Sequence, residues 1–210
     1  MKNGFKLSPR LLIPALIAGL ILAAAFEAAA FSNDVSEVSR AVMRLHVIAD
    51  GDGAWDQFVK LRVRDTVLRA TEDIAADAGS KDEFVSLIAA HLSEIERAAN
   101  DTMSSLGYPG TARAFVEHAG FPTREYNGVT LPAGRYDALK VVIGEGRGRN
   151  FWCVMFPPLC GGAIETRQGE EYLKDNLSPG AFLMITDPES DVRYEIRIWA
   201  ADVISGLINK

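Results

Sequence analysis

The first thirty residues have the pattern of an export segment. Sixteen positions, 11–26, form an apolar run without a charged residue. Three cations precede the run: Lys2, Lys6 and Arg10. A positive segment followed by an apolar run is typical of a secretory signal. The pattern therefore predicts that the rest of the chain is delivered across a membrane.

Small residues after the apolar run supply cleavage candidates. Ala25 and Ala30 each close a small-x-small triplet of the kind that signal peptidase recognises. A bilayer span takes about 20 apolar residues. A shorter run still fits a slightly thinned bilayer, so an uncleaved N-terminal anchor is the alternative to a cleaved signal peptide over 1–30. Either outcome places 31–210 outside the cytoplasm.

The next stretch changes from strand-like to helical periodicity. Apolar and polar positions alternate over 38–49, which predicts an early strand. Asp and Gly residues at 50–53 break the pattern. Apolar positions at helical spacing, beginning with Trp55 and Phe58, predict a first helix with these residues on its buried face. Ser80, with Glu83 three residues later, predicts the capped start of one second helix.

Strand-like periods dominate the later part of the chain. Residues 112–118, 136–143 and 150–156 read as strands, and the last two flank a glycine-rich loop. This arrangement predicts an antiparallel hairpin. Apolar positions at helical spacing from Val192 onwards predict a C-terminal helix. The order of these elements predicts an α+β fold, with 31–210 as a single domain.

Composition narrows the class of protein. The chain has 48% apolar residues and a formal net charge of −6. Because residues 1–30 carry three cations and one carboxylate, the remainder carries −8. Such a balance excludes a disordered chain and argues against a nucleic-acid partner, which requires clustered positive charge. We expect one acidic globular domain.

The two cysteines, Cys153 and Cys160, flank a loop that contains Pro157 and Pro158. Outside the cytoplasm an even pair is first read as a disulfide. A zinc site and a buried reduced pair are the alternatives, although zinc needs four ligands and no histidine lies nearby. The sequence predicts no metal and no cofactor.

His46 is the one histidine that suggests chemistry. Paired with Asp50 or Asp65 it would serve as a general base in an extracytoplasmic wall-modifying hydrolase. The chain has no recognised nucleophile or zinc-protease motif to accompany it. A structural His46 is the preferred interpretation, and we expect no enzyme.

The glycines of the loop over 144–149 suggest phosphate binding only superficially. A dinucleotide fingerprint opens a helix after a strand, whereas a strand-like run follows here. A turn is favoured, and an anion-binding nest aided by Arg147 and Arg149 is the alternative.

The densest apolar stretch is 151–159. Its first part predicts a central core strand. Its end, Phe156-Pro157-Pro158-Leu159, is interpreted either as core or as a rigid apolar knob that contacts a protein partner, a wall or a membrane surface. Arg44 and His46 are the other candidate partner contacts.

Several blocks of the chain resemble the stage II sporulation protein R family, in order and spacing. They begin with Arg44-Leu45-His46-Val47-Ile48-Ala49-Asp50 and Lys60-Leu61-Arg62-Val63-Arg64-Asp65. They continue with Phe121-Pro122-Thr123-Arg124-Glu125-Tyr126 and Leu131-Pro132-Ala133-Gly134-Arg135-Tyr136-Asp137-Ala138-Leu139. They end with Asn150-Phe151-Trp152-Cys153-Val154-Met155-Phe156-Pro157-Pro158-Leu159-Cys160.

This resemblance implies a signalling protein that is made in the forespore and exported into the space between the two septal membranes. There it would trigger a membrane-embedded aspartic protease of the mother cell, which then processes the precursor of sigma-E. We therefore expect that protease as the partner, and no small-molecule substrate.

Overall fold

The computed structural model describes residues 9–76, 78–160 and 163–187. Its helices are α1 (Pro9–Ala41), α2 (Ala54–Ile74), α3 (Lys81–Ala90), α4 (Leu92–Ser105), α5 (Ala163–Asn176) and α6 (Pro179–Thr186). Its strands are β1 (Met43–Ile48), β2 (Ala112–Phe121), β3 (Arg124–Tyr126), β4 (Val129–Leu131), β5 (Gly134–Ile143) and β6 (Asn150–Phe156). This content confirms the α+β class. The helix predicted from Val192 lies outside the described residues.

The main sheet has the strand order β2-β5-β1-β6. β1 is parallel to β5 and antiparallel to β6. The predicted hairpin between the last two strands is therefore wrong, because β1 lies between them. Local periodicity predicts where strands occur but not which strands pair. β1 forms its backbone hydrogen bonds with β5 on one side and β6 on the other, and both strands lie about ninety or more residues away in the chain. β6 is consequently an edge strand rather than a central one.

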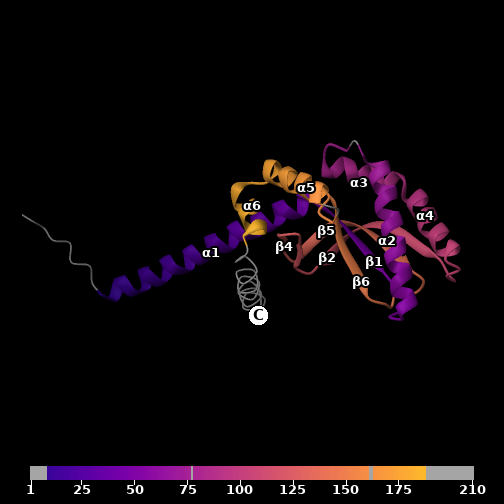
Figure 1. Ribbon diagram of the computed structural model, residues 1–210. Helices are drawn as coiled ribbons and strands as arrows, with labels where there is room; N and C mark the ends of the chain where they lie inside the picture. The colour runs from indigo at the N-terminus through magenta and orange to yellow at the C-terminus, as the bar shows by residue number, and fades with distance from the viewer. Residues whose placement is uncertain (1–8, 77, 161–162, 188–210) are drawn as a thin grey trace, which may run out of the picture.

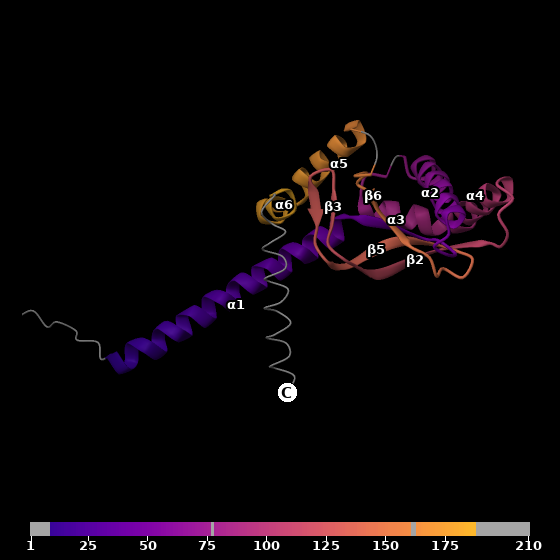
Figure 2. The same cartoon turned by 60° about the horizontal axis from the view of Figure 1, so that its bottom comes forward.

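Alternation along β1 assigns its side chains to two faces of the sheet. Met43, Leu45 and Val47 are fully buried against α2, α3 and α4, on what we call the inner face. Arg44 and His46 point to the opposite, outer face. In Figures 1 and 2 these three helices gather on one side of the sheet.

The helical layer on the inner face follows the predicted caps, with one difference. Ser80 Oγ accepts the backbone N–H of Glu83, which fixes the start of α3. The predicted single helix is divided at His91, whose backbone N–H bonds to the carbonyls of Leu87 and Ile88. This tightened turn ends α3 and lets α4 begin in a new direction.

A second layer covers one end of the outer face. The β3–β4 hairpin, the C-terminal end of α1, α5 and α6 meet there around a second apolar core (Figure 1). Val38 and Val42 are fully buried in that core. The early strand is thus shorter than predicted, because residues 38–41 belong to α1. Their spacing fits a helical stripe as well as it fits an alternating strand.

The apolar segment lies outside both cores. α1 is an unbroken helix, and its apolar part extends away from the domain in Figures 1 and 2. Ile13–Ala41 is long and apolar enough to cross a membrane, judged by length and composition. Burial begins only near Phe31, so both cleavage candidates, Ala25 and Ala30, precede the packed residues.

Candidate functional site

Arg44 is the buried cation of the outer face. It is the second residue of β1, and its side chain is fully buried. Nη2 donates a hydrogen bond to the hydroxyl of Tyr126 at 2.6 Å. Nε and Nη1 have no hydrogen-bond partner among the described residues. The guanidinium is therefore held in the core with most of its donors unsatisfied by that part of the chain.

Aromatic rings surround this guanidinium. Its carbon lies 4.3 Å from the ring centroid of Phe121, 4.9 Å from that of Tyr136 and 5.5 Å from that of Tyr126. Trp152 packs edge-on against Phe121, with centroids 4.8 Å apart. We call Phe121, Tyr126, Tyr136 and Trp152 the aromatic layer. Each ring face attracts a desolvated cation by about 1–2 kcal/mol, which offsets part of the cost of burying the charge.

His46 continues the same face two residues along β1. Its ring stacks on Trp152 with centroids 3.8 Å apart, and Nε2 lies 2.9 Å from Oδ1 of Asn150. Burial lowers the pKa of His46, and this outweighs the hydrogen bond to Asn150, which raises it. The imidazole is therefore a neutral, packed part of the sheet rather than an exposed contact.

The structure does not pair His46 with either predicted carboxylate. Oδ1 of Asp50 accepts the backbone N–H of Glu145 at 2.7 Å. Asp65 lies on α2, across the sheet, and forms a salt bridge with Arg64. The groups required for the hydrolase hypothesis are thus separated by the sheet or engaged with the backbone.

Replacing His46 by Gln is expected to flatten the pH dependence of stability. The folded-state pKa lies below the ordinary value of 6.5, so the unfolded chain binds the proton more readily. This stability is fully present above the unfolded pKa and declines as pH falls below it. Urea unfolding at pH 7.5 and 5.5 should show a larger loss in wild type than in His46→Gln. Equal losses would contradict a buried neutral imidazole.

The glycine-rich loop binds the chain's own carboxylates. Besides the Glu145 amide on Asp50, the amide of Arg149 donates to Oδ1 of Asp52 at 2.8 Å. The amide of Gly148 donates to the carbonyl of Ala49 at 2.9 Å. Two amides of the predicted anion nest are therefore occupied by internal carboxylates, and the loop closes over the end of β1.

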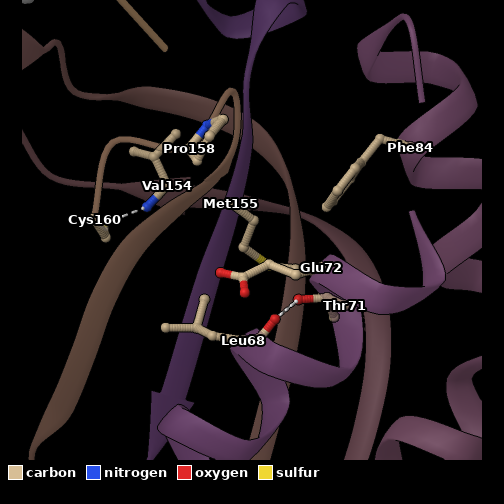
Figure 3. Close-up of a pocket in the computed structure, with 8 residues that line it drawn as sticks. All are labelled: Leu68, Thr71, Glu72, Phe84, Val154, Met155, Pro158 and Cys160. Carbon is tan, nitrogen blue, oxygen red and sulfur yellow. Dashed lines mark hydrogen bonds between the residues drawn. The ribbon is translucent and has the colours of Figure 1, made fainter. Parts of the chain in front are cut away.

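Cys153 and Cys160 are joined in a disulfide, with Cα atoms 6.0 Å apart. The backbone N–H of Val154 also donates to the sulfur of Cys160 at 3.0 Å (Figure 3). The bridge and this hydrogen bond fold the chain after β6 back onto the strand.

The predicted apolar knob is buried. Phe156 is 8% exposed and its ring packs on Phe84 and Tyr172, with centroids 5.2 and 4.9 Å away. Leu159 is fully buried in the second core. Within 156–159 only Pro158 is partly exposed. The turn does not project, because the disulfide and the second core hold it against the sheet.

A small cavity lies beside this turn, between β6, α2 and α3 (Figure 3). Its volume is about 110 Å³. It is lined by Leu68, Thr71, Glu72, Phe84, Val154, Met155, Pro158 and Cys160. Small-molecule sites usually occupy about 300–1,000 Å³, so this space suits a few water molecules rather than a substrate.

Two exposed aromatic residues were assigned wrongly by the sequence. Trp55 and Phe58 lie at the start of α2, 49% and 44% exposed, and their rings stack with centroids 5.3 Å apart. The predicted stripe placed them on the buried face. The same predicted stripe also contained Val59, Val63 and Val67, and these three residues are buried as expected. The helical spacing of apolar residues alone does not show that Trp55 and Phe58 are exposed.

The rings around Arg44 were also missed as a group. Phe121, Tyr126 and Tyr136 fall within two of the blocks that resemble a known family, and this was the available signal. Their convergence on one side chain of β1 depends on the sheet order and on the β3–β4 hairpin, which the turn-rich sequence between β2 and β5 did not indicate.

Comparison with known proteins identifies relatives for most of the domain. The family model described as stage II sporulation protein R matches residues 39–166. Stage II sporulation protein R of Bacillus subtilis (strain 168) is 33% identical over 138 residues, covering 63% of this chain and 62% of that protein. The matched stretch thus spans less than two thirds of the relative's length. No solved structure matches the chain.

The matched range contains Arg44, His46, the aromatic layer and both cysteines, whereas the apolar part of α1 and all of α6 lie outside it. The family model covers more than half of the chain. The chain therefore belongs to the stage II sporulation protein R family.

Proposed function

We propose that this chain is an exported signalling protein of sporulation. It activates a membrane-embedded aspartic protease of the neighbouring cell's septal membrane, and that protease then processes the sigma-E precursor. The domain acts from the forespore side, in the intermembrane space, without chemistry of its own. The observation that carries the proposal is the apolar helix, which stands outside the cores of a domain that belongs to a sporulation family.

The contact between α1 and the rest of the domain is compatible with export of the chain either with a cleaved signal peptide or with a retained membrane anchor. Glu37, near the end of α1, accepts hydrogen bonds from the backbone N–H and the hydroxyl of Ser178 at the start of α6. Cleavage after Ala25 or Ala30 would leave this contact in place. A retained anchor would hold the same domain close to the membrane surface.

Activation by contact requires a difference in affinity. A ligand shifts a protease towards its active arrangement only by binding that arrangement more tightly than the inactive one. The contact must therefore use groups on the surface. Arg44, His46, Phe156 and Leu159 are buried, so we assign them to shaping the domain instead of touching the partner.

The stacked pair Trp55 and Phe58 is the surface we propose for this contact. Exposed aromatic side chains are enriched at protein interfaces and often dominate their binding energy. The pair lies on α2, on the inner-face side of the sheet. It is held rigid by stacking, so little side-chain freedom is lost on binding.

The double substitution Trp55→Ser and Phe58→Ser is expected to reduce precursor cleavage at least about tenfold, because interface hot spots of this type contribute about 2 kcal/mol or more. The measurement is an immunoblot of the precursor in a non-sporulating host that co-expresses the chain, the protease and the precursor. Leu183→Ser is the matched control, since Leu183 is 63% exposed on α6. Unchanged cleavage in the double variant would contradict this contact surface.

A further inference from the structure

The two edges of the main sheet differ in how their outward backbone groups are satisfied. At the β6 edge, the backbone N–H of Val154 donates to the sulfur of Cys160, and its carbonyl accepts the N–H of Leu159. Nζ of Lys60 donates to the carbonyl of Arg149, just before that strand begins. The disulfide turn and Lys60 thus occupy backbone groups near both ends of the β6 edge.

β2 forms the other edge, next to β5 (Figure 2). Its first residues are covered by side chains of α4. Asn100 accepts the N–H of Ala112 and donates to its carbonyl, and Glu96 accepts the N–H of Ala114 at 2.9 Å. These bonds show that the backbone groups of Ala112 and Ala114 point away from β5.

Further along β2 the edge is open among the described residues. Because outward-pointing groups recur at every second residue of a strand, the N–H and C=O groups of Val116, His118 and Gly120 also point away from β5. In the described chain only the carbonyl of His118 is bonded there, by Nη2 of Arg135. We call residues 116–120 the open edge.

The open edge has none of the usual protection against pairing. β2 is ten residues long, contains no proline and pairs with β5 from Ala112 to Phe121 without a bulge. His118 and Gly120 are exposed. A long, regular edge strand of this kind is a template for pairing with another strand.

We propose that the open edge pairs with the open edge of a second copy of this chain. The two strands run antiparallel, with His118 opposite the partner's His118. Val116 then faces the partner's Gly120, so the outward N–H and C=O groups of all three residues are bonded. The two main sheets become one continuous sheet, with the helical layers of both copies on the same side.

The cover over the start of β2 and the charge of Glu117 select this register. Centring the pair on Glu117 would require the N–H of Ala114, which Glu96 already binds. It would also set Glu117 directly opposite the partner's Glu117, and like charges in that position are destabilising. With His118 at the centre, Glu117 lies opposite the partner's Ala119.

The end of β2 limits a shift in the other direction. Centring the pair on Ala119 would set Val116 opposite the partner's Pro122, which has no N–H to donate. The register centred on His118 also places the ring of Phe115, 36% exposed, opposite the partner's Phe121 on the outer face. Aromatic cross-strand pairs of this kind stabilise antiparallel strands.

A cysteine cross-link tests the register in the full-length protein, purified in detergent. In His118→Cys the two substituted positions lie about 5.5 Å apart, within reach of a disulfide. Gly120→Cys is the matched control, because it lies on the same edge and the same face, but its two copies lie about 13 Å apart along the strands. We expect mild oxidation to give at least about five times more disulfide-linked dimer with His118→Cys, measured on a non-reducing gel. Equal amounts, or no linked dimer with His118→Cys, would overturn the proposal.

A second comparison isolates the backbone hydrogen bond. His118→Pro removes the outward N–H but no bond to β5, and proline is tolerated at such edge positions. His118→Ala removes the same imidazole and keeps the N–H. In sedimentation of the full-length proteins we expect the dimer dissociation constant of His118→Pro to be at least about tenfold higher than that of His118→Ala. Equal constants would contradict pairing through this edge. Neither measurement involves protease activation, so both are independent of the proposed signalling function.

Discussion

Substitution of Arg44 by alanine is expected to lower the free energy of unfolding by about 3 kcal/mol or more, whereas Arg44→Met should change it by less than about 1 kcal/mol. Alanine leaves a cavity among Phe121, Tyr126 and Tyr136, which all lie within 5.5 Å of the guanidinium. Methionine fills much of that space and removes a buried charge whose Nε and Nη1 have no partner in the described chain.

Urea unfolding of wild type and both variants at neutral pH measures the two effects. Tyr126→Phe serves as the control for the single hydrogen bond from Arg44 to the Tyr126 hydroxyl, and it should cost about 1 kcal/mol. A loss from Arg44→Met as large as that from Arg44→Ala would mean that the charge itself stabilises the fold, contrary to this account.

The second large effect is expected at Gly148, in the loop that closes over β1. A Cβ there would overlap the carbonyl oxygen of Gly51 and lie 2.9 Å from Cβ of Ala49. Gly148→Ala must therefore push apart two backbone segments and lengthen the hydrogen bond from Gly148 to Ala49. We expect a loss of about 2 to 3 kcal/mol in the free energy of unfolding.

Gly120→Ala is the matched control for this prediction. Gly120 lies in β2 with no atom within 4 Å of its expected Cβ. The same chemical change should there leave stability unchanged or slightly higher, since alanine restricts the unfolded chain. Thermal unfolding of both variants decides the matter, and a Gly148→Ala protein as stable as Gly120→Ala would show that the two loops are not in contact.

Much of the fold follows from local patterns in the sequence. The start of α2, the Ser80 cap and all three long strands after Gly110 were predicted, because each depends on residues close together in the chain. The extra residues of α1 were missed because Val38 and Val42 fit two periods at once. Only the packing of this segment against α6 and β5 distinguishes a helix from the strand that the sequence predicted.

The pairing of β5 and β6 could not be predicted in this way. A glycine-rich loop between two apolar strands usually marks a hairpin, but here Asp50 and Asp52 draw the loop over the end of β1. The carboxylates that do this precede the loop by more than ninety residues. Long-range hydrogen bonds of this kind have no signature in a local pattern.

In the candidate site, too, local patterns identified individual residues but not the long-range contacts that surround them. The sequence analysis named Arg44 and His46 as candidate partner contacts, whereas both side chains are buried in the structure. A partner-facing arginine became the cation of an aromatic layer, because the outer face is covered by β3, β4 and α6. Whether a side chain of β1 is exposed depends on this covering layer. Part of the layer, the β3–β4 hairpin, comes from residues 121–134, for which the sequence predicted only turns.

The most direct measurement of the central claim is precursor processing in sporulating cells that lack the native gene. One strain carries the full chain, and one carries Leu16→Arg with Leu20→Arg in the exposed apolar segment. The third carries Asn33→Arg with Ser36→Arg, at exposed positions closer to the C-terminal end of α1. The account predicts processed sigma-E with the first and third proteins and none with the second, whose export fails. Full processing by a chain that stays intact in the cytoplasm of the forespore would contradict the account.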